Sequence, residues 1–121
     1  MKTRTALVIL ATMAVLASCA HIDPHPMDMT SAVQNAKTSA DHEALARHYD
    51  DAAKSMQAKA DQQKRMLAEY HRHAYYYGRR TDDLIEHSEA LVRVYEEAAR
   101  ANENLAHYHR LLAEDTSEME S

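Results

Sequence analysis

Apolar side chains recur every three or four residues along two long segments of this 121-residue chain. When Tyr49 in the first segment and Tyr95 in the second are taken as heptad position a, the e column is apolar throughout both segments, and most other large apolar residues fall in columns a and d. This period predicts amphipathic α-helices at residues 39–77 and 83–114. We expect a loop at 78–82, which contains the single glycine, and an acidic tail at 115–121.

A connection this short makes the two helices antiparallel neighbours. The sequence therefore predicts an all-α fold, an antiparallel two-helix hairpin that resembles a coiled coil. Pairing Tyr77 with Leu84 sets a register in which Tyr49 meets Leu112 and Ala52 meets His109. The residues expected to form the interaction stripe are Tyr49, Met56, Met66, Tyr70, Leu84, Leu91, Tyr95, Leu105 and Leu112.

Three apolar columns are more than one partner helix covers, because a two-stranded coiled coil needs only a and d. Two helices also bury little surface, and folds of this size usually need a crosslink or a partner to be stable. We therefore expect the hairpin to dimerise into a four-helix bundle. The alternative is a monomeric hairpin whose alanine-lined face packs tightly.

The two helical segments also resemble each other in sequence. Residues 43–54 align without gaps to residues 89–100, and seven of the twelve positions are identical. An internal duplication is the better explanation of this match than chance convergence of alanine-rich helices.

The first 18 residues have the pattern of a secretory signal peptide. Lys2 and Arg4 precede the apolar run 6–17, which is too short to cross a bilayer as a helix. The run closes on Leu16-Ala17-Ser18-Cys19, which resembles the lipobox of bacterial lipoproteins. That resemblance implies cleavage before Cys19 and acylation of Cys19 by diacylglycerol and a fatty acid such as palmitate. The alternative is an ordinary secreted protein with a coincidental cysteine.

A lipidated Cys19 would anchor the protein in the cell envelope, facing the periplasm, with residues 19–38 as a tether. Several acyl chains on one cysteine hold a protein far more firmly than one chain does. An aspartate directly after the lipidated cysteine would resemble an inner-membrane retention signal, but this position is Ala20. The outer membrane is therefore favoured if the organism has two membranes. The rest of the chain loosely resembles small exported helical proteins rich in His and Ala, a resemblance that implies no activity.

Charge and motifs narrow the function further. Without Lys2 and Arg4, 12 of the 14 basic residues remain against 19 acidic ones, a net charge of −7. This balance disfavours nucleic acid as a partner and adhesion to anionic lipid. The chain has no phosphate-binding glycine loop and no nucleophile motif, so we expect no enzyme activity and no cofactor. The predicted role is structural, or interaction with itself or with another envelope protein.

Nine histidines are the remaining chemical signal, and all follow Cys19. Copper or zinc binding is one alternative, since imidazole and thioether groups suit these ions and a site needs three or four converging ligands. A pH response is another, because His42, His73 or His109 held neutral between the helices would oppose folding once charged. Ordinary helix-surface positions are the third interpretation. The candidate metal ligands are His21, His25, His48, His73, His87 and His109.

Overall fold

The computed structural model describes residues 28–121 of the chain. Within them there is no strand, and the elements are helices α2 (Met29–Asn35), α3 (Ser39–Arg72), α4 (Ala74–Tyr77) and α5 (Thr81–Glu120), with a 3₁₀ turn, η2 (Gly78–Arg80), between α4 and α5. The all-α fold class is therefore confirmed. No helix in this part of the chain combines the length and apolarity needed to cross a membrane.

Helix α2 lies within the segment that the sequence predicts as a tether. Asp28 begins it, because the Asp28 carboxylate accepts a hydrogen bond from the Ser31 backbone N–H at 3.3 Å and the Asp28 carbonyl accepts one from Ala32. An aspartate at this position satisfies amide groups that the first helical turn leaves without partners. The seven-residue helix and the hairpin that follows it form separate units.

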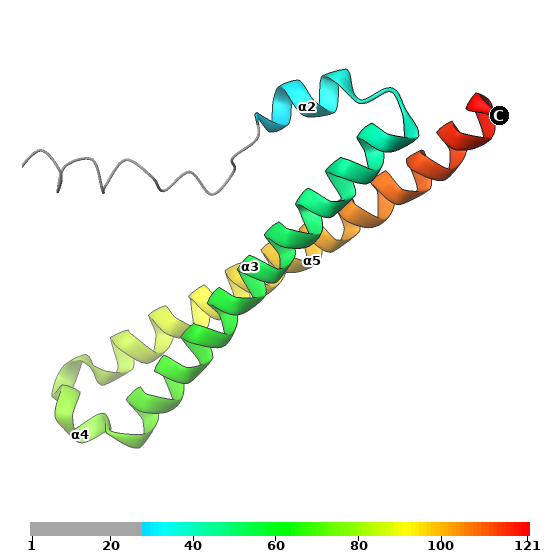
Figure 1. Ribbon diagram of the computed structural model, residues 1–121. Coiled ribbons are helices and arrows are strands. Elements are labelled where there is room, and N and C mark those ends of the chain that lie inside the picture. The colour runs from blue at the N-terminus through cyan, green and yellow to red at the C-terminus, as the bar shows by residue number, and fades with distance from the viewer. Residues whose placement is uncertain (1–27) are drawn as a thin grey trace, which may run out of the picture. The chain divides into compact units, whose positions relative to one another are not determined.

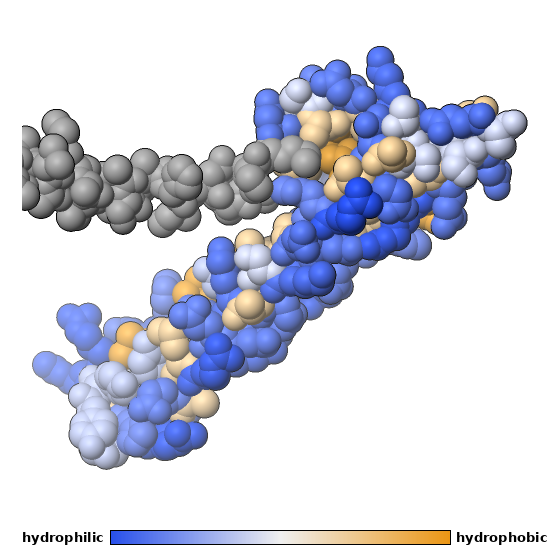
Figure 2. All heavy atoms as spheres, viewed as in Figure 1, coloured by the Kyte–Doolittle hydropathy of each residue, from blue (hydrophilic) through white to orange (hydrophobic). Residues whose placement is uncertain are grey.

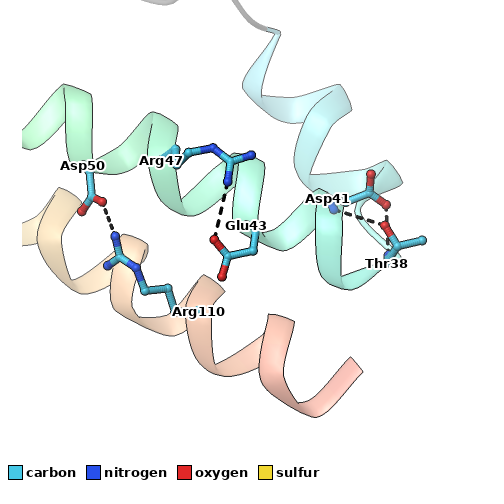
Figure 3. Close-up of polar contacts among 6 residues, drawn as sticks. All are labelled: Thr38, Asp41, Glu43, Arg47, Asp50 and Arg110. Carbon is cyan, nitrogen blue, oxygen red and sulfur yellow. Dashed lines mark hydrogen bonds and ion pairs between the residues drawn. The ribbon is translucent and has the colours of Figure 1, made fainter. Parts of the chain in front are cut away.

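Helices α3 and α5 run antiparallel and contact each other along their length, which confirms the hairpin (Figure 1). Helix α3 begins with a capping box. The Thr38 hydroxyl accepts a hydrogen bond from the Asp41 backbone N–H at 3.1 Å, and the Asp41 carboxylate accepts one from Thr38 at 3.0 Å (Figure 3). Together these bonds satisfy two amides at the helix start.

The α3–α5 interface is built from small side chains. Its most buried residues include one alanine per heptad on each helix: Ala46, Ala53 and Ala60 on α3, and Ala99, Ala106 and Ala113 on α5. All six belong to the e column. Alanine lets two helix backbones approach closely, so this column occupies the centre of the interface.

The helix register follows from two ion pairs that join α3 to α5. Asp50 pairs with Arg110, and Lys64 pairs with Glu96 at 2.7 Å. The partners are 14 residues apart on both helices, so the register is continuous over two heptads. It places Ala53 opposite Ala106.

The ion pairs place the axial register within about two residues of the predicted one, but different faces of the helices meet. Tyr49 stacks on His109, with ring centroids 5.5 Å apart, and Leu112 is 44% exposed instead of facing Tyr49. The expected pairing of a with d positions is replaced by a and e columns facing each other. Small e residues allow a closer helix approach than the larger d residues would, and the d column of α5 is left at the edge of the interface.

The turn end also departs from the expected boundaries. Helix α3 stops at Arg72, and α4 and η2 occupy residues that were expected to complete the first helix and the loop. The Thr81 hydroxyl donates to the carbonyls of Ala74 and Gly78, both at 2.8 Å, and thereby closes this connection. Gly78 has φ 57° and ψ −132°, a conformation that glycine adopts more readily than other residues.

The C-terminal boundary moves in the opposite direction. Residues 115–120, predicted as an acidic tail, continue helix α5 to Glu120. The Thr116 hydroxyl donates to the Leu112 carbonyl at 2.6 Å, one turn earlier in the helix.

Candidate functional site

The outward side of α5 carries a second apolar stripe, distinct from the α3–α5 interface. Val94 is 57% exposed, Leu105 41% and Tyr108 61%. They belong to a run of apolar residues spaced alternately by three and four positions, which places the run on one face of the helix. We call this run the outer stripe: Leu91, Val94, Ala98, Ala101, Leu105, Tyr108 and Leu112.

Five of the seven stripe residues are exposed, and Leu91 and Ala98 are half-buried, because the α3–α5 interface uses columns a and e of α5, whereas the stripe uses columns d and g. At 100° per residue, the centres of the two faces lie roughly 110° apart around the helix axis. Figure 2 shows hydrophobic residues at intervals along the visible face of the hairpin. A regular apolar heptad pattern in contact with water is typical of a surface that binds another helix.

The structure divides the interaction stripe expected from the sequence. Leu105, Leu112 and Met66 are exposed, and Met66 is the least exposed of the three at 37%. The six others are half-buried between or beside the helices: Tyr49, Met56, Tyr70, Leu84, Leu91 and Tyr95. Val94, Ala101 and Tyr108 were not among the predicted stripe residues, although their three- and four-residue spacing from column d is visible in the sequence.

A second candidate site lies between the helices at the open end of the hairpin, where α3 begins and α5 ends. The Nδ1 atoms of His42 and His109 are 3.1 Å apart, and the ring centroids are 5.4 Å apart. The centroid distance exceeds the Nδ1–Nδ1 distance by about twice the distance from an imidazole centre to its own Nδ1. The two nitrogens therefore lie on the line that joins the ring centres. The imidazoles therefore meet edge to edge, with one Nδ1 donating and the other accepting.

His109 is one of the few buried polar residues, at 9% exposure. The Tyr49 ring lies nearly parallel to the His109 ring, with 12° between the ring planes and 5.5 Å between the ring centroids. Burial, followed by the charge on His42, lowers the pKa of His109 below its usual value. Close by, the Asp50–Arg110 ion pair joins the same two helices at the surface (Figure 3).

Hydrogen bonds also shift the pKa values of two groups outside this site. Hydrogen bonds from the backbone N–H groups of Lys37 and Thr38 lower the pKa of Asp41. The hydrogen bond to Glu96 raises the pKa of Lys64. Both groups are exposed. Asp41 belongs to the cap of α3, and Lys64 belongs to a surface ion pair.

The remaining candidate histidines are not brought together. The Nδ1 of His73 lies 2.6 Å from the carboxylate of Glu69, four residues earlier in the chain, His87 is exposed, and the His48 ring meets Tyr49 edge-on at 5.9 Å. His21, His25 and the lipidation candidate Cys19 lie outside the described residues. Within residues 28–121, no three His, Cys, Asp or Glu side chains converge as metal ligands would.

No protein-family model, curated protein sequence or solved structure matches this chain. Its function is therefore argued from its own residues.

Proposed function

We propose that this chain is a lipid-anchored envelope protein whose hairpin is an interaction module, with the outer stripe of α5 as the docking surface for another helix. The observation that carries the interaction role is the apolar heptad pattern of residues 91–112, in which Val94, Leu105, Tyr108 and Leu112 are each more than 40% exposed. Leaving such a pattern in water costs free energy that a helical partner would recover.

The anchor is supported by the lipobox pattern at residues 16–19. We expect cells supplied with a labelled palmitate analogue to label the wild-type protein and not Cys19→Ser. The mass of the mature N-terminal peptide should show cleavage before residue 19 and the added acyl chains. Recovery of unacylated, uncleaved chain from the native host would contradict the anchor and leave the docking surface untouched.

Covering of the stripe can be measured in cells without knowing the partner. Ala101→Cys places a thiol in the stripe, and Ala58→Cys places one on the far side of α3. Both alanines are exposed in the single chain. If the stripe is covered, a small maleimide should modify position 101 at least ~10-fold more slowly than position 58, because a buried helix interface excludes the reagent.

Equal modification rates at the two positions in intact cells would overturn the docking function. Urea-unfolded samples of both variants provide the reference, since each thiol must then react at the same rate. In this experiment the lipidated Cys19 carries no free thiol.

A second candidate function is a response to acid, and the His42–His109 pair favours it. Only one of the facing Nδ1 atoms can carry a proton while the contact is kept. Protonation of both rings would place two cations 3.1 Å apart between the helices. We expect backbone amides of residues 106–113 to lose hydrogen-exchange protection on acidification to pH 5.5, after correction for intrinsic rates. Unchanged protection there would exclude the acid response.

A further inference from the structure

The outer stripe has a symmetric order of side-chain sizes. From its start it carries two large residues, two alanines and two large residues, at spacings that read the same in both directions: Leu91, Val94, Ala98, Ala101, Leu105 and Tyr108. A two-fold symmetric interface uses the same patch on both subunits and must be complementary to itself. This order satisfies that condition when two stripes run in opposite directions.

We propose that the occupant of the outer stripe is a second copy of this chain, with the two α5 helices packed antiparallel about a two-fold axis between Ala98 and Ala101. This inference rests on the proposed docking function. In the symmetric arrangement Ala98 packs on the partner's Ala101. The two alanines let the helix axes approach closely at the crossing point, as they do in the α3–α5 interface.

The flanking layers then fill the space on either side of the alanines. Val94 meets the partner's Leu105, and Leu91 meets the partner's Tyr108. Each layer combines one residue from column d with one from column g, two columns that alternate with the three- and four-residue spacing of a coiled-coil seam. Beyond them Leu112 meets the partner's His87, so the apolar match ends within about two turns of Tyr108.

The position of α3 selects antiparallel over parallel packing. The outer stripe is roughly 110° around α5 from the α3–α5 interface, close to the right angle of a square bundle. Antiparallel α5 helices place both α3 helices on one side, so four helices form a bundle in which α5 contacts both α3 and the partner's α5. A bundle with its two-fold axis along the helices would instead lay the partner's α3 on the stripe.

That second arrangement pairs an apolar surface with a mostly polar one. The side of α3 that would face the stripe carries columns d and g. Column d mixes Leu45, Ala52 and Met66 with Lys59 and His73, and column g is polar throughout: Asp41, His48, Ser55, Gln62 and Glu69. Covering the outer stripe with these groups would bury polar atoms against Leu and Val, which is unfavourable. The stripe of a second α5 is the apolar surface that this chain itself offers.

The test measures distances between identical spin labels in the two subunits. Arg100, His107 and Glu114 are exposed, fall in one heptad column, and can each be replaced by cysteine in the Cys19→Ser chain. Moving the label by one heptad from the axis separates the two copies by about 21 Å along the bundle, because each helix contributes seven rises of 1.5 Å. We expect the distance to be shortest at position 100, longer at 107 and longest at 114.

Each other result is decisive. Equal distances at the three positions would indicate parallel α5 helices, which overturns this inference while self-association stands. Absence of any intermolecular distance, together with a monomer mass at ~100 µM by sedimentation equilibrium, would overturn the second copy as occupant. The docking function would then be decided by the thiol modification in cells.

Matched variants connect the signal to the stripe. Ala101→Lys should weaken dimerisation at least ~100-fold, because it buries a charge at the crossing point. Ala58→Lys makes the same chemical change on the far side of α3 and should leave the distance at position 100 unchanged. Circular dichroism should show the same helicity for both variants. Equal dimerisation of the two lysine variants would contradict the proposed crossing point.

Discussion

The open end and the turn end of the hairpin are stabilised by different kinds of contact. At the open end, residues far apart in sequence pack together: Leu45 and Ala46 are buried, and His42 and Tyr49 contact His109 across the interface. At the turn end, the contacts are between near neighbours in sequence. They include the Thr81 hydroxyl bonds and the edge-to-face rings of Tyr70 and Tyr77.

This difference has consequences for stability. Contacts at the turn end form as soon as the chain turns, because little loop entropy is lost in closing them. Contacts at the open end require both long helices to be in register. The open end should therefore be the part of the hairpin whose stability depends most on core packing and on pH, and the turn end the part that depends on backbone conformation.

The largest expected effect is the loss of a core side chain at the open end. Leu45 is 2% exposed, and Leu45→Ala should lower the free energy of unfolding by about 2–5 kcal/mol. Leu84→Ala makes the same change at a half-buried position near the turn and should cost less. Urea unfolding at one fixed protein concentration measures both, since any dimer makes stability depend on concentration. A larger loss for Leu84→Ala would reverse the comparison.

The contrast also explains what the sequence could predict. The two helices and their reversal near Gly78 follow from apolar periodicity and from a single glycine. The choice of facing columns does not, because three columns are apolar and periodicity alone leaves open which two face the other helix. The small side chains of Ala53 and Ala106 decide which columns face each other, because they allow the two helices to approach closely. Residues 91–112 were therefore seen as one half of an interface, whereas Leu105 and Leu112 lie exposed.

The histidine pair was missed for the same reason. The expected pairing of columns a and d placed His109 against Ala52, whereas the observed facing of the two a columns brings it to Tyr49 and His42. The helix ends were governed by hydroxyl and carboxylate bonds. Thr81 bonds two carbonyls of the turn, and Asp28 begins a helix inside the expected tether. Such side-chain-to-backbone bonds depend on local geometry that heptad patterns do not encode.

The next largest loss of stability is expected at the turn end, from a change in backbone conformation. Gly78→Ala meets no atom within 4 Å of the added Cβ, so its whole cost comes from holding alanine at φ 57° and ψ −132°. Sparsely populated conformations of this kind cost about 1–3 kcal/mol. Thermal unfolding should show the loss for Gly78→Ala and almost none for the exposed neighbour Arg79→Ala. An unchanged melting temperature for Gly78→Ala would mean that the turn adopts another conformation.

Acid should act on the open end and leave the turn end largely unaffected. The pKa of His109 is lowered by burial and by His42, so below pH ~6.5 the unfolded chain binds more protons at this residue than the folded chain does. The stability that it contributes is present above that pH and is lost as the pH falls toward and through the folded pKa. The lowered pKa of Asp41 acts only below pH ~4, which separates the two effects.

His109→Asn tests this pH dependence. Asparagine keeps a hydrogen-bonding atom near the position of Nδ1 and does not titrate. The fall in melting temperature between pH 7.5 and 5.5 should be smaller in His109→Asn than in wild type. His107→Asn removes an exposed histidine two residues away and should retain the wild-type slope. Identical slopes in all three proteins would remove His109 as the source of acid sensitivity.

The smallest expected effect is the contribution of the two ion pairs that join α3 to α5, whose residues all lie in one heptad column. Asp50–Arg110 lies near the open end, and Lys64–Glu96 lies closer to the middle of the hairpin. All four side chains are at least 31% exposed, and exposed pairs usually contribute about 0.2–1 kcal/mol. Double-mutant cycles with Asp50→Asn and Arg110→Gln, and with Lys64→Gln and Glu96→Gln, measure each coupling free energy. Both should decrease when salt is raised from 0.05 to about 0.5 M, because mobile ions screen exposed charges. A coupling at Asp50–Arg110 above about 2 kcal/mol that resists salt would show that this pair, and not the packing around Leu45 and His109, holds the open end together.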